Sequence, residues 1–156
     1  ALATFVRRTQ PAVWRLCAAL GRPEDPADLA QETYSRMLRS MHTYRGEAPV
    51  QVWLLSIARR VCADAVRRLQ RHRRLVDRIL RAQSLDISEP AHDGTLADLL
   101  TRLSPERREV FVLTQQVGLS YEETAALLEC PIGTVRSRLA RARDDLQRAV
   151  DEAETA

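Results

Sequence analysis

The 156-residue sequence has no lysine, few aromatic residues and only five glycines, and each scarcity narrows the fold class. Aromatic side chains make up 4% of the chain, so a core must be built mainly from Leu, Val, Ile and Ala. No glycine-rich phosphate loop is present, and no stretch alternates apolar and polar residues for long enough to indicate a β-strand. The composition therefore predicts an all-α protein with one ordinary domain or two small ones.

Cysteine is also scarce, and long apolar runs are missing. Cys17, Cys62 and Cys130 are odd in number and have no metal-ligand spacing, so we interpret them as reduced core thiols of a cytoplasmic protein. No stretch has the length of a membrane span, and no signal peptide is visible, so no membrane partner is expected. The three histidines are isolated from any nucleophile or base at a catalytic spacing. The sequence predicts no enzyme, cofactor or metal site.

Positive charge is concentrated rather than abundant. All 24 basic residues are arginine, yet the net charge is only +3. Residues 59–81 hold nine arginines against Asp64 and Asp77, whereas the rest of the chain has 15 arginines against 19 acids. Such a block predicts a polyanionic partner that binds at one place, with a solvated helix face as the alternative.

Hydrophobic spacing divides the chain into two helical parts and a linker. In the first part, three helices are expected at residues 2–20, from Asp25 or Asp28 to about 41, and from about 50 into the arginine block, with a loop at 44–49. Residues 82–97 contain Pro, Gly and three acids but no arginine, which is typical of a flexible interdomain linker. Residues 98–152 are expected to form four short helices.

The second part contains a helix, a tight break and a further helix between Gly118 and Arg143. Ser120 and Glu123 have the spacing of a capping box, which predicts the start of the first of these helices. Pro131 then opens the second. This arrangement is typical of a helix-turn-helix, in which the second helix enters the major groove of DNA.

That last helix is predicted to have an apolar face and a cationic face. At about 100° per residue, its buried stripe consists of Val135, Leu139, Ala142 and Leu146. The expected DNA-reading residues are Thr134, Arg136, Ser137, Arg138, Ala140, Arg141 and Arg143. Small side chains let a helix approach base edges closely, and arginine can donate two hydrogen bonds to one guanine. No acid occurs from Pro131 to Arg143, whereas a merely solvated face would normally include some.

Three motifs, in this order and spacing, resemble the bacterial extracytoplasmic-function (ECF) sigma factors of the sigma-70 family. They are Asp28-Leu-Ala-Gln-Glu-Thr-Tyr34, Trp53-Leu-Leu-Ser-Ile-Ala-Arg-Arg60, and Gly118-Leu-Ser-Tyr-Glu-Glu-Thr-Ala continued by Gly133-Thr-Val-Arg-Ser-Arg-Leu. The resemblance covers essentially the whole chain. It implies an alternative sigma factor that binds core RNA polymerase, recognises the −35 and −10 promoter elements and opens the DNA.

The resemblance also implies a domain organisation. Residues 1–81 would form a sigma-2-like bundle of three or four helices, which binds polymerase and recognises and melts the −10 element. Residues 98–152 would form a sigma-4-like helix-turn-helix domain that reads the −35 element, and residues 82–97 would be the flexible linker. The linker acids Asp86, Glu89 and Asp93 are expected to mimic nucleic acid inside the polymerase.

Site residues and partners follow from the same resemblance. The residues implied to contact the β′ clamp helices of core polymerase are Asp28, Leu29, Gln31, Glu32 and Arg36. Those implied in −10 binding and melting are Tyr44, Arg45, Trp53, Arg59, Arg60, Asp64, Arg67, Arg68 and Arg71. The polymerase β flap is a further implied contact. Family members are commonly held inactive by an anti-sigma protein, which the sequence alone does not identify.

Some positions keep two interpretations. Trp53 has Ile57 and Val61 one and two turns later, which favours a core residue over a base-stacking platform. Arg60 stands where many family members carry asparagine, so the −10 preference is not predicted. The run from Arg71 to Arg74 either binds upstream duplex or repels collapse of the linker. For the whole chain, the rival functions are an operator-binding regulator with a sensing or dimerisation domain, and a module that binds acidic protein.

Overall fold

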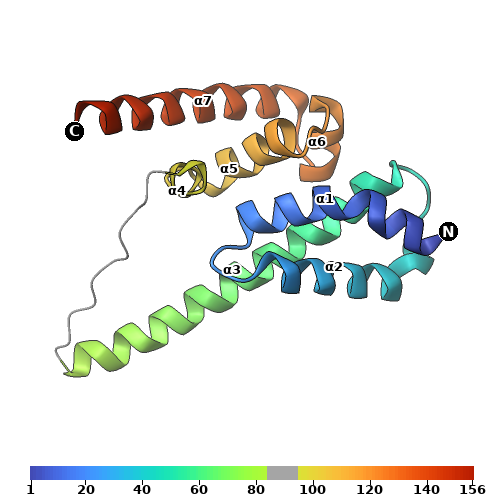
Figure 1. Ribbon diagram of the computed structural model, residues 1–156, viewed down its shortest axis with the longest axis horizontal. Helices are drawn as coiled ribbons and strands as arrows, with labels where there is room; N and C mark the ends of the chain where they lie inside the picture. The colour runs from blue at the N-terminus through green and yellow to red at the C-terminus, as the bar shows by residue number, and fades with distance from the viewer. Residues whose placement is uncertain (84–94) are drawn as a thin grey trace.

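The computed structural model describes residues 1–83 and 95–156, and both parts are helical (Figure 1). Most of the expected linker, including its three acids, lies outside the described residues. The helices are α1 (Leu2–Leu20), α2 (Pro26–Ser40), α3 (Val50–Gln83), α4 (Leu96–Thr101), α5 (Pro105–Phe111), α6 (Tyr121–Leu128) and α7 (Ile132–Thr155). A 3₁₀ turn (Met41–Thr43) follows α2, and a π-helical turn (Val112–Gln116) extends α5. The all-α prediction is confirmed.

Two helices begin as the sequence predicts. At α2, the carboxylate of Asp25 accepts a hydrogen bond from the backbone N–H of Ala27 at 2.9 Å, so Asp25 rather than Asp28 is the cap. At α6, Ser120 and Glu123 each accept a hydrogen bond from the other's backbone N–H, at 3.0 Å, which completes the capping box. The expectation of four short helices in the second half is wrong for α7, which has 24 residues.

The first half is a three-helix bundle with an apolar core. Its buried side chains come from one face of each helix and include Leu16 of α1, Met37 of α2 and Leu54 of α3. Gly21 ends α1 where α2 passes closely, because a Cβ at this position would lie 2.1 Å from Cδ1 of Leu29. A larger residue at this position would have to displace the buried side chain of Leu29 and would also lie 2.9 Å from the carbonyl oxygen of Cys17.

Two cysteines lie inside this core, as the sequence predicts. Cys17 of α1 and Cys62 of α3 are both buried, and neither forms a disulfide. The pKa of the Cys62 thiol is raised well above its usual range by a hydrogen bond with Cys17 and by burial. Cys62 is therefore a protonated thiol at neutral pH. Cys130, between α6 and α7, is only partly buried.

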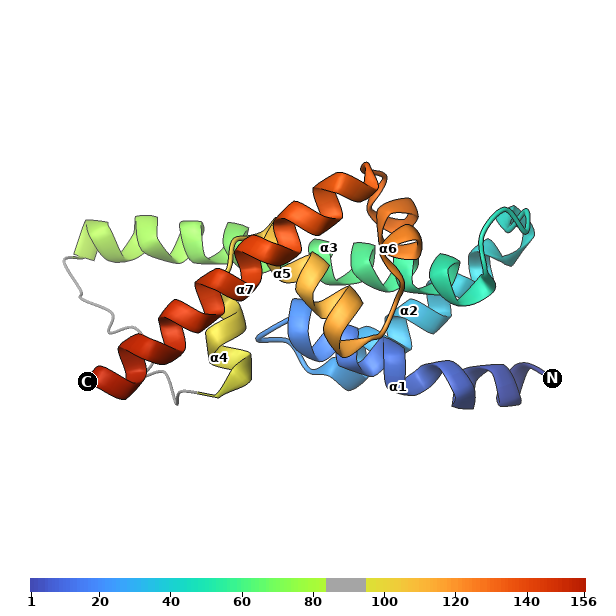
Figure 2. The same cartoon turned by 90° about the horizontal axis from the view of Figure 1, so that it is seen from above.

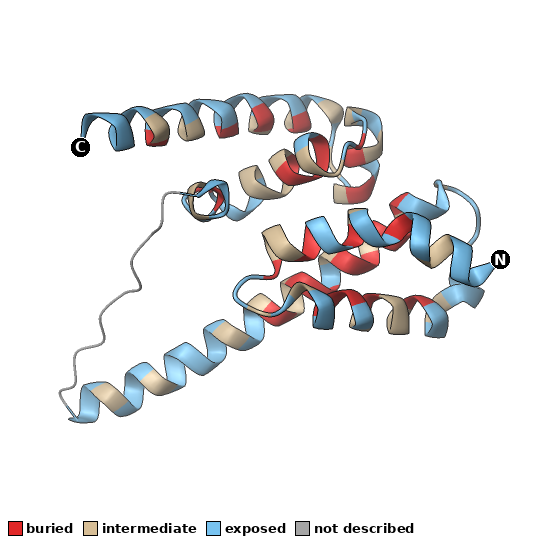
Figure 3. Ribbon diagram, viewed as in Figure 1, coloured by how far each residue is buried: buried red, intermediate tan, exposed pale blue. Residues whose placement is uncertain are grey.

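The two halves pack against each other. α6 lies against α3, and the π-helical turn after α5 lies against α1 (Figure 2). Buried residues of both halves form one continuous hydrophobic cluster that includes Leu16 and Ala58 of the first half and Leu113 and Leu127 of the second. Figure 3 shows that the buried surfaces face one another, whereas the last turns of α3 are largely exposed. The linker is thus not the only connection between the halves.

Candidate nucleic-acid and polymerase interfaces

α7 has the two faces that the sequence predicts. Val135, Leu139 and Ala142 are at most 1% exposed, and Leu146 is partly buried. On the other side, the exposed residues are Arg136, Ser137, Ala140, Arg141 and Arg143, with Thr134 and Arg138 partly buried at the flanks. Within the described parts of the chain, none of these four arginines forms an ion pair. Their donors are therefore available to an outside acceptor.

The supports under α7 are packed and hydrogen-bonded. α6 ends at Glu129, whose backbone is in the left-handed region with a φ of 54°. This conformation terminates the helix and turns the chain toward α7. Further along α7, Asp145 binds Arg107 of α5 and also Arg148, the latter at 2.6 Å. α5 and α6 both pack on the buried side of α7. The arginine face is thus supported from behind by α5 and α6.

Arg108 fastens α4 to α5, a role that the sequence does not indicate. Its Nε donates to the carbonyl of Leu100 at 2.7 Å, and its Nη2 donates to those of Thr101 and Leu103 at 3.0 and 2.9 Å. These carbonyls lie in the last turn of α4 and just after it, where the regular helical hydrogen-bond pattern ends. Burial lowers the pKa of Arg108, but a guanidinium remains charged at neutral pH. Arg108 therefore has a structural role within the second half.

α3 is one continuous helix, so its arginines form the long stripe that the sequence predicts. The residues on this line are Arg60, Asp64, Arg67, Arg71, Arg74 and Arg78. The arginines of the line are exposed, as is Arg68 beside it. Nη2 of Arg68 lies 3.5 Å from Oε1 of Glu24, in the turn between α1 and α2. The stripe could follow a phosphate backbone, but Asp64 interrupts it with a negative charge.

Asp64 joins the stripe of α3 to α2. Arg36 donates to Glu32 at 2.7 Å and to Asp64 at 2.8 Å, and Arg67 also donates to Asp64. The hydrogen bond with Arg36 lowers the pKa of both carboxylates, and the two carboxylates raise the pKa of Arg36. Two expected polymerase contacts and two expected DNA contacts therefore form one charge network.

The expected polymerase residues of α2 differ in exposure. Asp28 and Gln31 are exposed, and Glu32 and Arg36 are partly exposed at the network described above. Leu29 is only 2% exposed, because it packs in the core of the first half beside Gly21. The motif thus supplies polar side chains to the surface, whereas its leucine holds α2 in the bundle.

The loop before α3 is organised by two aromatic rings. The centroids of Tyr44 and Trp53 are 5.1 Å apart with the planes tilted by 41°. The hydroxyl of Tyr44 donates to the carbonyl of Ala48 at 2.7 Å. Trp53 packs against the hydrophobic core, which agrees with the core interpretation, while Arg45 is exposed. The two rings and the hydrogen bond of Tyr44 therefore hold the loop against α3, while Arg45 remains exposed.

Arg59 faces the second half of the chain. Its Nε and Nη2 donate to the two carboxylate oxygens of Glu109 in α5, at 2.9 and 3.2 Å. This is a bidentate pair between residues that are distant in sequence. In this arrangement two of the three guanidinium nitrogens of Arg59 are bound to Glu109, whereas Arg60 is on the exposed side of the same helix.

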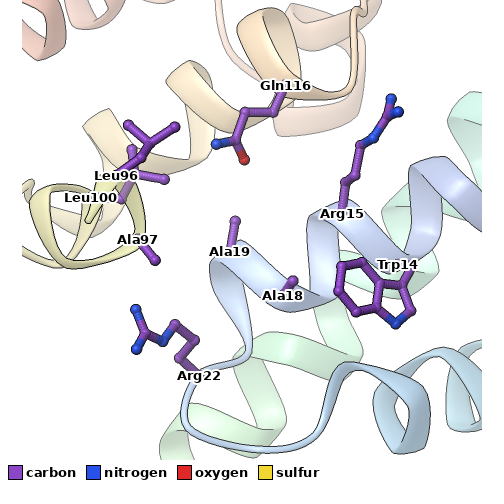
Figure 4. Close-up of a pocket in the computed structure, with 9 residues that line it drawn as sticks. All are labelled: Trp14, Arg15, Ala18, Ala19, Arg22, Leu96, Ala97, Leu100 and Gln116. Atoms are coloured by element: carbon purple, nitrogen blue, oxygen red, sulfur yellow. The ribbon is translucent and has the colours of Figure 1, made fainter. Parts of the chain in front are cut away.

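A groove of about 440 Å³ lies between α1 and α4 (Figure 4). Its walls include Trp14 and Ala18 of α1, Leu96 of α4 and Gln116 of the π-helical turn. No residue of this groove was expected at a site. Over residues 1–83 and 95–156, no group of three or more His, Cys, Asp or Glu is arranged to hold a metal, and no helix is long and apolar enough to cross a membrane.

Comparison with known proteins agrees with these features. The family model of Sigma-70 region 2 matches residues 5–72, and that of Sigma-70, region 4 matches residues 94–146. The ECF RNA polymerase sigma factor SigC of Mycobacterium tuberculosis (strain CDC 1551 / Oshkosh) is 40% identical over 152 residues, which cover 94% of this chain and 81% of that protein. The chain belongs to the ECF RNA polymerase sigma factors. This sigma factor directs promoter-specific initiation by RNA polymerase.

More distant relatives and solved structures are similar over most of their length. The ECF RNA polymerase sigma-E factor of Haemophilus influenzae (strain ATCC 51907 / DSM 11121 / KW20 / Rd) is 27% identical, over 94% of this sigma factor and 85% of that protein. CnrH, solved in complex with the cytosolic domain of CnrY, has a TM-score of 0.74 at 27% identity, covering 96% of this chain and 87% of that one. RpoE of Bartonella quintana, solved with the anti-sigma factor NepR, shares the fold with a TM-score of 0.69 at 24% identity, covering 96% of each chain.

Proposed function

We propose that the two halves of this sigma factor divide promoter recognition between them. α7 reads the −35 element, while the loop at 44–49 and the exposed side of α3 bind and melt the −10 element. The feature that supports this most strongly is the outer face of α7, where four arginines, with no acid partner among residues 1–83 and 95–156, surround the small residues Ser137 and Ala140. Such a face fits against base edges in a major groove.

The proposed −10 site combines the aromatic ring pair of the loop with the exposed arginines of α3. A base that leaves the duplex needs a pocket, and the separated strand needs cations along its phosphates. Tyr44 and Trp53 supply a rigid aromatic wall beside Arg45, and Arg60, Arg67 and Arg71 supply the cations. Arg68 and Asp64 lie beside that path. Arg59 would join them once its pair with Glu109 opens.

Core polymerase binds the exposed polar edge of α2 in this proposal. Asp28, Gln31 and Glu32 present acceptors that suit an arginine-rich helix such as the β′ clamp helices, and the β flap would contact the second half. Because Arg36 connects Glu32 to Asp64, a partner that draws Glu32 away would also change the charge balance along α3. The protein would act in the cytoplasm, where an anti-sigma protein could hold it.

In vitro transcription with core polymerase and genomic promoters tests the proposal. Core enzyme with this chain is expected to initiate at promoters where core enzyme alone does not. Binding of the isolated chain to a duplex operator, without any gain in initiation, would instead indicate an ordinary regulator. Footprints on the active promoters should then place α7 at the −35 element, as judged by cleavage from a reagent attached to the variant Asp144→Cys, at an exposed position next to the arginine face.

A further inference from the structure

The last turns of α3 project beyond the three-helix bundle of the first half. Buried residues on this helix end at Ala65, and from Arg67 to Gln83 each residue is exposed or partly exposed (Figures 1 and 3). Residues 73–83, called here the α3 extension, also lie beyond the region 2 match, which ends at residue 72. At 1.5 Å per residue the extension adds about 15 Å of helix.

One side of this projecting helix carries a line of arginines. Relative to Arg67, the side chains of Arg71, Arg74, Arg78 and Arg81 fall within about 40° of one direction. All four are exposed, and within the described parts of the chain none has an ion-pair partner. Asp77, the one acid in this stretch of sequence, lies about 80° away from the line.

Without a bound anion, the arginines of this line repel one another. Arginines three and four positions apart on a helix are neighbours, and like charges at that spacing repel one another. No packed core opposes this repulsion, because no other element within the described residues covers the extension's arginine side. A polyanion that neutralises the line removes the repulsion, and it releases its own counterions in doing so.

We propose that the arginine line of the α3 extension binds the phosphates of the promoter duplex that flanks the −10 element. This inference rests on the proposed function, because the line continues Arg60 and Arg67 of the −10 site along the same side of α3. Its length matches about four to five base pairs at 3.4 Å each. Phosphate contacts of this kind add affinity and fix register without reading sequence.

The opposite side of the extension offers a competing partner. Leu75 and Ile79 are 56% and 51% exposed, and Val76 and Leu80 lie beside them, partly buried. An acidic protein helix could cover these apolar residues. The arginine line favours DNA instead, because it is directed away from Val76 and Leu80 and continues the existing basic stripe.

The test is a triple variant, Arg74→Ala with Arg78→Ala and Arg81→Ala, assayed as holoenzyme with core polymerase. Alanine favours helix, and all three side chains are exposed, so folding should be retained. A charge-matched control replaces Arg7, Arg8 and Arg15 of α1, which are also exposed. Promoter affinity is measured as a function of salt concentration on two DNAs. One is a full promoter, and the other is a short fragment that lacks the duplex flanking the −10 element.

The expected result is promoter binding that is roughly tenfold weaker at moderate salt, with a salt slope reduced by about 0.9 for each phosphate that the variant no longer neutralises. The weakening should be equal on promoters with altered −10 bases and absent on the short fragment. The α1 control should keep the wild-type slope.

Two results would overturn the inference. In one, the triple variant has the slope of the wild type or of the α1 control. In the other, the variant binds core polymerase more weakly in the absence of DNA, and Leu75→Gln with Ile79→Gln does the same, which would assign the extension to a protein partner. Failure of the proposed function is distinguishable, because the wild-type holoenzyme would then not initiate at all.

Discussion

α3 and α7 are both arginine-rich helices, yet they hold their arginines differently. On the packed part of α3, up to Arg67, acidic residues are close by: Asp64 binds Arg36 and Arg67, and Glu109 binds Arg59. On α7, the outer face from 134 to 143 has no acid partner among the described residues and includes small side chains. A paired arginine is fixed in one direction, whereas an unpaired one can adjust to a base edge. The small side chains among the arginines suit α7 to reading base edges, whereas the exposed arginine line of α3 suits that helix to following a phosphate backbone.

The largest expected difference between the two helices is in folding stability, and it concerns the buried side of α7. Leu139→Ala removes a side chain that is 1% exposed, and we expect a decrease of about 2–5 kcal/mol in the free energy of unfolding. Ile79→Ala on α3 is the matched control, and because its side chain is 51% exposed it should change stability by less than about 0.5 kcal/mol. Urea unfolding of both variants measures the difference. Equal decreases would show that the α3 extension is packed in solution.

Arginine substitutions test whether the two helices read DNA differently. Arg141→Ala should cost about 1–3 kcal/mol for each base that the side chain no longer reads, and it should relax selectivity at the −35 element. Arg71→Ala should instead weaken binding by the same factor on all sequences. Binding to a set of substituted promoters gives both profiles. A uniform weakening for Arg141→Ala would mean that this residue holds only phosphate.

The pair between the halves gives a smaller effect. Glu109→Gln leaves Arg59 without its carboxylate, and we expect a destabilisation of about 1 kcal/mol or less, because the pair is partly exposed. The halves should separate more often, as measured by energy transfer between dyes attached to α2 and α7. Glu106→Gln, at an exposed acid of the same helix, is the control. An unchanged distance distribution would show that the hydrophobic cluster alone holds the halves together.

Acid titration gives the smallest effect and concerns α3 alone. The pKa of Asp64 is lowered from its ordinary value of 3.8 by Arg36 and Arg67, so its contribution to stability is complete above that value. This contribution is lost as the pH falls through the lowered pKa. Asp64→Asn should therefore be slightly less stable near neutral pH and should lose less stability in acid. Because the pair is about one-third exposed, the effect should be well below 1 kcal/mol. Parallel urea titrations at several pH values would contradict this if both proteins had the same acid dependence.

Local signals in the sequence predicted much of the fold. The capping box at Ser120, the cap at Asp25 and the buried stripe of α7 depend on residues within a few positions, so spacing alone identifies them. The close packing of Leu29 on Gly21 was not predicted, because it joins two segments whose approach depends on how the helices pack.

Contacts between distant residues were not predictable. The pairs Arg59–Glu109 and Arg36–Asp64 join different helices, and a chain whose cations are all arginine gives no local sign of which one meets an acid. The role of Arg108 was not predictable either, because its acceptors are backbone carbonyls, which every residue has. The exposed face of α7 was easier to predict, because its pattern lies within a single helix.

Arg108 also shows that the charges of this protein cannot be exchanged freely. An engineered version with lysine in place of arginine would keep the net charge and the pattern of basic stripes. At position 108, however, the planar fork reaches three carbonyls at once from two nitrogens, and a lysine ammonium is a single point on a flexible stem. α4 has only six residues, so it depends on this fork at one end and on its Thr95–Asp98 capping box at the other. Recoding this chain with lysine would therefore be expected to unfold α4 first, the shortest α-helix among the described residues.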